Sequence, residues 1–118
     1  MSGRRANAAA QANGELEGAA PLFAALGDAR RLRLLARLCE AGPLSIVRLC
    51  DGADISRQAV TKHLRVLAEA GLVRGVRQGR ESRWVLEPAP LAEARSYLDL
   101  ISNQWDEALG RLRELVEH

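Results

Sequence analysis

The most regular alternation of apolar and polar positions lies between residues 56 and 70. At about 100° of rotation per residue, Val60, Leu64 and Leu67 fall together on one side of a helix. The opposite side carries amide, hydroxyl and cationic groups and no carboxylate; its residues are Gln58, Thr61, Lys62 and Arg65. The pattern predicts an amphipathic helix over about residues 56–70.

Local signals predict where this helix begins and where it ends. Ser56 is a residue type favoured at a helix N-cap, and glycine, here Gly71, is favoured just past a last turn. Two short apolar runs come next, joined by the turn-forming residues 78–81. They predict a β-hairpin over about residues 72–86, with Trp84 on its core side because it alternates with Leu86.

Three shorter helices are predicted before residue 56. Pro21 is expected to open the first, over residues 22–26, and Asp28 to cap the second, over residues 29–41. The third covers about residues 45–52. The expected buried positions of the last two are Leu32, Leu35, Leu38, Cys39, Ile46, Leu49 and Cys50. The arginines of the second helix, Arg30, Arg31, Arg33 and Arg37, are expected to be mostly solvated. Residues 1–19, without sustained periodicity, are predicted to be a disordered tail.

A last helix is predicted over about residues 91–116. Its apolar residues recur at alternating steps of three and four, from Leu91 and Ala94 through Leu98, Ile101, Trp105, Ala108, Leu112 and Leu115. A narrow seam of this length indicates a contact with the same helix of a second subunit. The alternative is that it packs against its own domain.

Together these elements predict a mainly α fold with a small β-hairpin, a winged helix-turn-helix that dimerises through its last helix and forms one domain over residues 20–118. An ordinary helical corner and a protein-binding winged helix, acting as an adaptor without operator binding, are the alternatives.

The composition fits a globular protein. Of 118 residues, 47% are hydrophobic and 27% charged, and the apolar runs are too short to span a bilayer. No secretory signal is evident, so a cytoplasmic, nucleoid-associated protein without membrane contact is expected. Net charge is +2, but residues 56–86 hold seven Arg and Lys against two Glu, whereas residues 87–118 hold three Arg against seven acids. The basic middle indicates a surface for a polyanion.

The polar side chains of the helix over about 56–70 suit double-stranded DNA, because amide and cationic groups read base edges and hold phosphates. Nothing indicates an enzyme: there is no glycine-rich phosphate loop, no triad spacing and no metal-ligand set. No cofactor is expected. For His63, a place at the helix rim or a bond to backbone or phosphate is favoured over a catalytic role.

The residues quoted above resemble the ArsR/SmtB family of bacterial winged-helix repressors. The matching stretches are LFAALGDARRLRLL at 22–35, SRQAVTKHLRVLAEAGLV at 56–73 and WVL at 84–86. The resemblance implies a homodimer that is built from its terminal helices, the first and the last. This dimer binds a palindromic operator and blocks transcription until an effector, here unknown, releases it. It also implies DNA contacts by Ser56, Arg57, Gln58, Thr61, Lys62, Arg65, Arg77, Arg80 and Arg83. The implied dimer contacts are Leu22, Phe23, Leu98, Ile101, Trp105 and Leu112.

The sequence departs from the family where many members bind metal. The family's C-x-C pair in the third helix aligns with Ser45 and Val47, and the ligand pairs of its last helix are missing. Two scattered Cys and two scattered His do not make a tetrahedral set, so no metal sensing is predicted. Cys39 and Cys50 are a possible redox switch, but inert core thiols are the favoured interpretation because both lie on predicted apolar faces.

Overall fold

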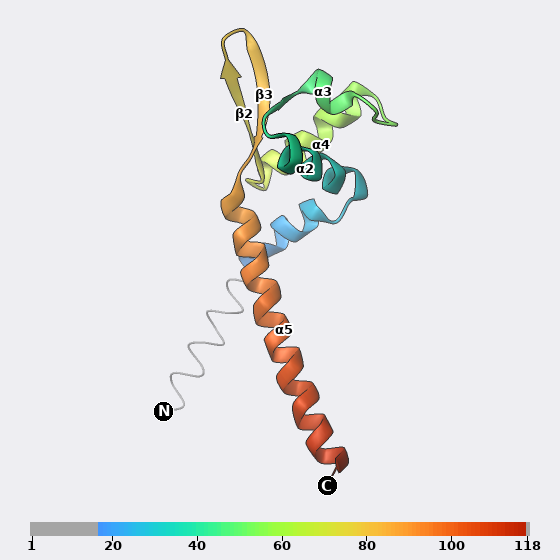
Figure 1. The fold of residues 1–118 in the computed structure, drawn as a ribbon, viewed down its shortest axis with the longest axis vertical. Coiled ribbons are helices and arrows are strands. Elements are labelled where there is room, and N and C mark those ends of the chain that lie inside the picture. The colour runs from blue at the N-terminus through green and yellow to red at the C-terminus, as the bar shows by residue number, and fades with distance from the viewer. Residues whose placement is uncertain (1–16, 118) are drawn as a thin grey trace.

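The fold is a cluster of short helices with a β-hairpin on one side and a long terminal helix extending away from it (Figure 1). This computed structural model describes residues 17–117. The first helix is described over residues 17–26, and the later elements are α2 (Ala29–Ala41), β1 (Leu44–Ser45), α3 (Ile46–Cys50), α4 (Arg57–Glu69), β2 (Val73–Gln78), β3 (Glu81–Leu86) and α5 (Pro88–Glu117). The predicted fold class is confirmed.

Side-chain caps set the starts of the helices. The Asp28 carboxylate accepts hydrogen bonds from the backbone N–H groups of Arg30 and Arg31, at 2.8 and 3.2 Å. The Ser56 hydroxyl accepts one from the N–H of Ala59 at 3.1 Å. Each bond satisfies an N–H that has no partner within its own helix. Both cap predictions are confirmed.

Gly71 ends α4 in a Schellman motif. Its φ is +78°, a conformation that costs glycine little and other residues more. The N–H of Gly71 donates to the carbonyl oxygen of Ala68 at 3.0 Å, and the N–H of Leu72 donates to that of Leu67 at 2.9 Å. The chain therefore turns sharply and delivers Leu72 to the core as β2 begins.

The core combines one face from each helix with the base of the hairpin. Its fully buried side chains are Leu49, Val60, Leu64, Leu67 and Leu72, and Leu34, Leu35 and Leu38 are 5%, 5% and 2% exposed. Two predicted core residues of α2 are elsewhere: Leu32 is 49% exposed, and Cys39 is also exposed. The stripe prediction was wrong for them because the face of α2 that meets α4 is centred on Leu34 and Leu38.

The predicted solvation of the α2 arginines was wrong for Arg31 and Arg37. The Arg37 guanidinium donates to the carbonyl oxygens of Leu49, Arg48 and Asp51, at 2.7, 2.6 and 3.2 Å. It therefore caps the C-terminal end of α3, where helix carbonyls lack intrahelical partners. A sequence pattern does not show such a contact because it joins residues more than ten positions apart.

The sheet has three antiparallel strands in the order β1-β3-β2. β2 and β3 pair from Val73 opposite Leu86 to Gln78 opposite Glu81, and the turn between them has Gly79 at φ +67°. Trp84 packs against the core, as predicted. The strand β1 was not predicted, because a two-residue strand is too short to show alternation.

The N-terminal boundaries differ from those predicted. Residues 17–19, assigned to a disordered tail, are helical, and Ala19 is 4% exposed. Pro21 therefore lies within the first helix and does not open it. The rest of the predicted tail, residues 1–16, lies outside the described residues. The predicted third helix, about 45–52, shortens to Ile46–Cys50 because Ser45 is its cap and pairs in β1.

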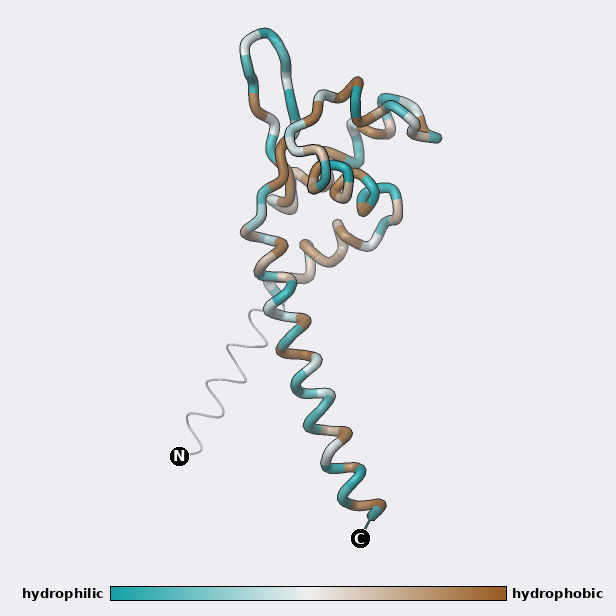
Figure 2. Tube along the Cα trace, in the orientation of Figure 1, coloured by the Kyte–Doolittle hydropathy of each residue, from teal (hydrophilic) through white to brown (hydrophobic). Residues whose placement is uncertain are grey.

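The helix α5 leaves the domain after its first turns. Leu91 packs against the core and Ala94 is buried, but Leu98, Ile101, Trp105, Leu112 and Leu115 are 45–78% exposed. Apolar segments recur along the whole rod to its C-terminal end (Figure 2). Packing against its own domain therefore accounts only for the beginning of the apolar stripe.

Candidate nucleic-acid interface

The outward face of α4 carries the side chains that the sequence assigned to DNA contact. Val60, Leu64 and Leu67 fix the inward face, each with no exposed surface. Because the helix rotates about 100° per residue, this anchoring turns the other face outward. There Arg57, Gln58, Thr61, Lys62 and Arg65 line one shallow open depression. The structure thus brings five of the predicted contact residues together on a rigid element.

The chemistry of this face suits a polyanion. Within α4 the cations Arg57, Lys62 and Arg65 are exposed, and the single acid is Glu69 in the last turn, four residues after Arg65. The Thr61 hydroxyl donates to the carbonyl oxygen of Arg57 at 2.9 Å, which leaves its lone pairs and methyl group available. Gln58 offers both donor and acceptor, the pair of groups that can recognise adenine in the major groove.

Ser56 contributes differently from the other predicted residues. Its hydroxyl oxygen accepts the Ala59 N–H, so its first role is to hold the N-terminus of α4 in place. That N-terminus also presents unpaired backbone N–H groups, which favour a nearby anion. The cap therefore positions both the helix and its positive end.

The arginines of the hairpin, or wing, differ in their position along it, in their exposure and in their ion-pair partners. Arg77 and Arg80 are exposed near the tip. Arg83 is only half-exposed and its guanidinium binds the Glu81 carboxylate, with nitrogen–oxygen distances of 2.9 and 3.2 Å. At the base of the wing Arg74 pairs with Glu87. Arg77 and Arg80 are consequently the wing residues best placed to meet a phosphate, and Arg83 has a competing partner.

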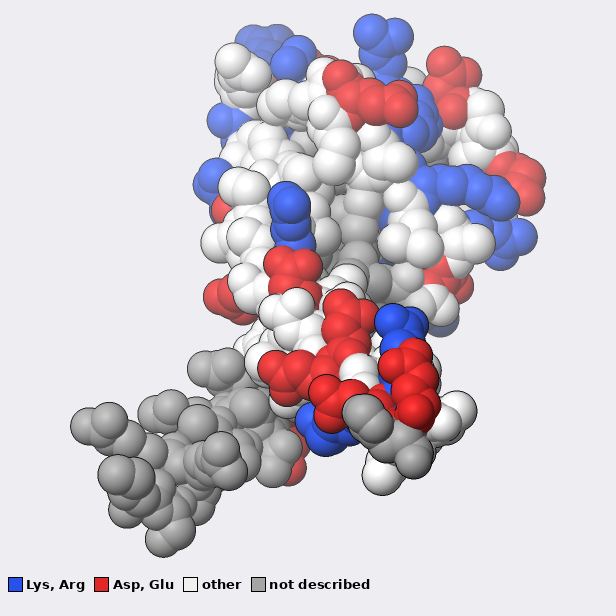
Figure 3. All heavy atoms as spheres, turned by 60° about the horizontal axis from the view of Figure 1, so that its bottom comes forward, with Lys and Arg blue, Asp and Glu red and all other residues white. Residues whose placement is uncertain are grey.

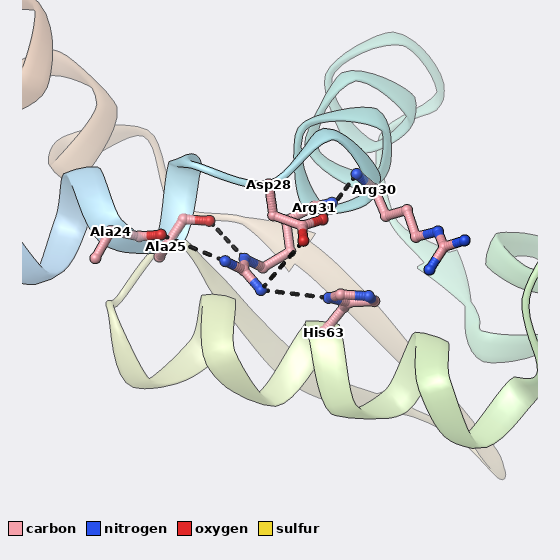
Figure 4. Close-up of polar contacts among 6 residues, drawn as sticks. All are labelled: Ala24, Ala25, Asp28, Arg30, Arg31 and His63. Atoms are coloured by element: carbon pink, nitrogen blue, oxygen red, sulfur yellow. Dashed lines mark hydrogen bonds and ion pairs between the residues drawn. The ribbon is translucent and has the colours of Figure 1, made fainter.

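A polar cluster that the sequence did not reveal supports α4 from behind (Figure 4). The Arg31 guanidinium donates to the carbonyl oxygens of Ala25 and Ala24, at 2.6 and 3.3 Å, which end the first helix. It also approaches Nδ1 of His63 at 3.4 Å. One side chain of α2 thus joins the first helix to the middle of α4. No local pattern could have indicated this contact, because Arg31 and His63 are 32 residues apart.

Asp28 completes the same cluster. Its carboxylate lies 3.9 Å from the Arg31 guanidinium and accepts two backbone N–H bonds. The backbone hydrogen bond from Arg31 is the main reason that the pKa of Asp28 is lowered from its ordinary value of 3.8. Asp28 is therefore ionised at neutral pH and favours the start of α2.

Charges of opposite sign are separated along the molecule. Acidic side chains gather over the exposed length of α5, nearest the viewer in Figure 3, whereas basic side chains spread over the domain behind it. This agrees with the counts for residues 56–86 and 87–118. A polyanion is attracted to the domain and repelled by the rod.

The remaining candidate groups form no second centre in the described part of the chain. Cys39 is exposed, Cys50 is half-buried, and both are free thiols, so the interpretation as inert core residues was wrong for Cys39. Between residues 17 and 117 there is no group of three or more His, Cys, Asp or Glu that could hold a metal ion. Over the same residues no helix has the length and hydropathy needed to cross a bilayer.

The predicted dimer residues divide into two groups. Leu22 is 6% exposed in the core of the single chain, and the Phe23 ring meets Tyr97 of α5 edge-on, with ring centroids 6.5 Å apart. Leu98, Ile101, Trp105 and Leu112 are exposed on α5. The exposed α5 residues are therefore available to an apolar partner, whereas Leu22 is buried within its own protomer.

Comparison with known proteins identifies relatives of this chain. Residues 26–76 match the model of a helix-turn-helix domain. An HTH-type transcriptional regulator of Mycobacterium tuberculosis is 36% identical over 93 residues, which are 79% of this chain and 83% of that protein. The arsenical resistance operon repressor of Escherichia coli is 35% identical over 78 residues, which are 66% of this chain and 67% of that protein.

Solved structures give the same result. An ArsR-like transcriptional regulator from Rhodococcus sp. RHA1 superposes with a TM-score of 0.75 at 35% identity, over 86% of this chain and 95% of that one. A winged helix-turn-helix DNA-binding domain from Mycobacterium bovis, described as homodimeric, superposes with a TM-score of 0.57 at 25% identity, over 78% of this chain and 82% of that one.

Proposed function

The chain belongs to the ArsR-like family of winged helix-turn-helix proteins and is a DNA-binding transcriptional regulator; from this premise we propose that it represses transcription as a homodimer bound to a palindromic operator. The observation that carries the proposal is the outward face of α4, where amide, hydroxyl and cationic groups are held by a fully buried inner face. Repression then results from occupying a promoter and requires no chemistry. The relatives are likewise regulators and not enzymes.

Each contact residue has a role that its chemistry supports. Gln58, Thr61, Lys62 and Arg65 read base edges in the major groove, because they lie on the outward face of the recognition helix α4. Arg57, at the first position of that helix, holds a phosphate beside the groove, helped by the capped end at Ser56. Arg77 and Arg80 carry the wing onto a neighbouring stretch of backbone. Arg83 joins them only by giving up its bond to Glu81.

The exposed stripe of α5 supports a homodimer. Seven large apolar side chains of α5 are more than two-fifths exposed, an unusual concentration for a surface helix that has no partner. Their stripe is continuous with the buried Ala94 and with Leu91, so a second copy of α5 extends the existing core. A two-fold axis along this contact sets two recognition helices about 34–36 Å apart, one turn of DNA.

The proposal does not include metal sensing. Ser45 caps α3 through its hydroxyl, and the exposed Val47 has no ligand atom, so the two positions aligned with the family's C-x-C pair hold no thiolate. The effector that releases the operator must then be recognised by other groups.

The test is binding to the DNA upstream of the chain's own coding region, measured by fluorescence anisotropy at low and high salt. We expect tight binding that weakens by several orders of magnitude between about 50 and 200 mM salt, since phosphate contacts release counterions. Gln58→Ala should lower the preference over an unrelated duplex, whereas the control Arg95→Ala, on the exposed part of α5, should not. Salt-insensitive binding, or equal affinity for every duplex, contradicts the proposal.

A further inference from the structure

A cleft lies between α2 and the turn that leads into the recognition helix. Its apolar lining comes from Leu34, Ala53 and Ile55, with the fully buried Leu49 and Val60 directly behind. The turn at residues 51–55 forms one wall, and the cleft encloses about 320 Å³. That volume is at the lower end of the range found for small-molecule sites, which usually combine an apolar floor with a few polar groups.

The rim of this cleft is cationic. Three arginines of α2, Arg30, Arg33 and Arg37, line it, against the two carboxylates of Asp51 and Asp54. Within the described residues, the one ion pair on the rim joins Arg30 to Asp54 at 3.8 Å, between side chains that are 49% and 68% exposed. Exposed pairs of this kind contribute little and are readily exchanged. The Arg33 side chain has no hydrogen-bond or ion-pair partner between residues 17 and 117.

Arg37 gives the cleft a fixed wall. Its guanidinium holds the carbonyl oxygens of Arg48, Leu49 and Asp51, so the backbone at the start of the turn is bound to α2. Its positive charge lines the cleft and adds to the attraction for an anion. The site is therefore partly formed before any ligand arrives.

We propose that this cleft binds a small organic anion with an apolar body, such as a medium-chain carboxylate, and that its occupation changes the affinity for DNA. The apolar body packs against Leu34, Ala53 and Ile55, and the carboxylate meets Arg33 and Arg30. The cleft is bounded by α2, by the end of α3 and by the turn that precedes the α4 cap Ser56, so a ligand here acts on the orientation of the recognition helix. Only this second, regulatory part rests on the proposed function.

Octanoate is the probe for the site, and octanol is its neutral control. In amide NMR spectra of the full chain, octanoate should shift the signals of Leu34, Ala53 and Val60, with an affinity at least tenfold higher than that of octanol. The double variant Arg30→Gln, Arg33→Gln should weaken octanoate binding at least tenfold, and the control Arg95→Gln on α5 should not. Ala53→Phe, which fills the cleft from an exposed turn position, should abolish the shifts.

The regulatory part is tested with the upstream DNA. Saturating octanoate should change the Kd for DNA at least fivefold, the lower end of ordinary allosteric coupling, in the unmodified chain but not in Ala53→Phe. Shifts confined to α5, or equal binding of octanol, overturn the site. An unchanged Kd in a chain that binds both octanoate and DNA overturns the coupling. Octanoate binding in a chain that never binds DNA leaves the site standing and overturns the proposed function instead.

Discussion

Truncation of Trp105 tests whether the exposed stripe of α5 is the dimer contact. The side chain is 66% exposed and lies between Ile101 and Leu112 on one face of the helix. In a homodimer both copies of Trp105 lie at the two-fold contact, so a single substitution acts twice. Trp105→Ala should therefore shift the monomer–dimer equilibrium strongly toward the monomer.

The magnitude comes from the exposed area. A tryptophan side chain of about 250 Å² that is two-thirds exposed offers about 160 Å² for burial in the dimer. Substitution by alanine removes about 100 Å² of this area. At about 25 cal/mol per Å² this is about 2.5 kcal/mol per protomer and about 5 kcal/mol per dimer. Because area converts incompletely into affinity, we expect the dimer Kd to rise by at least about 100-fold.

Sedimentation velocity across a dilution series measures this change directly. Asn103→Ala is the matched control, since residue 103 is exposed on the opposite side of the same helix and the substitution favours helix formation as much as Trp105→Ala does. It should leave the dimer Kd unchanged. A monomeric unmodified chain, or equal effects of the two substitutions, would refute the assignment of the stripe to dimerisation.

Three further predictions concern the interface and its support. Arg57→Ala should make the dependence of log K on log salt shallower by about two for a dimer, because each lost phosphate contact removes about 0.9 of a released counterion; an unchanged slope would show that Arg57 does not contact a phosphate. Gly71→Ala should lower the free energy of unfolding by about 1 kcal/mol, since φ at Gly71 is +78°, whereas Gly110→Ala, in an open helical position, should raise it in the same urea titration. Asp28 has a lowered pKa in the folded chain, so its stabilising effect is present above the unfolded value near 3.8 and is lost as pH falls through the folded value. In thermal melts across a pH series, the melting temperature of Asp28→Asn should therefore fall less at acid pH than that of the unmodified chain. An equal fall in both proteins would contradict the prediction.

Much of the fold was predictable because its signals are local. The helix over Ala29–Ala41 and the recognition helix have a cap at the start, a glycine just past the end and an apolar period between. The hairpin has two apolar runs around a turn glycine. These features act within a few residues, so the sequence alone indicates them. The candidate contact face was predictable as well, because an inward apolar stripe leaves only one side of α4 for Gln58, Lys62 and Arg65.

The errors share a different cause. Leu32 and Cys39 were assigned to the core because they fit a helical period, but only packing against α4 decides which part of that period is covered. Arg31 and Arg37 were expected in solvent, yet both bind backbone carbonyls of other elements. The two-residue strand β1 exists only through its pairing with Trp84 and Arg83.

The amino-acid sequence by itself determined the helices and the hairpin, their order and the side of the recognition helix that faces outward, because helix periodicity, caps and turn glycines act over short distances. Only the tertiary structure decided that Leu22 belongs to the protomer's core, that α5 carries its apolar stripe beyond the domain, and that Arg31 joins the first helix to His63. These contacts link residues far apart in the chain. Their free energy depends on which surfaces meet when the helices pack, and no local pattern contains that information.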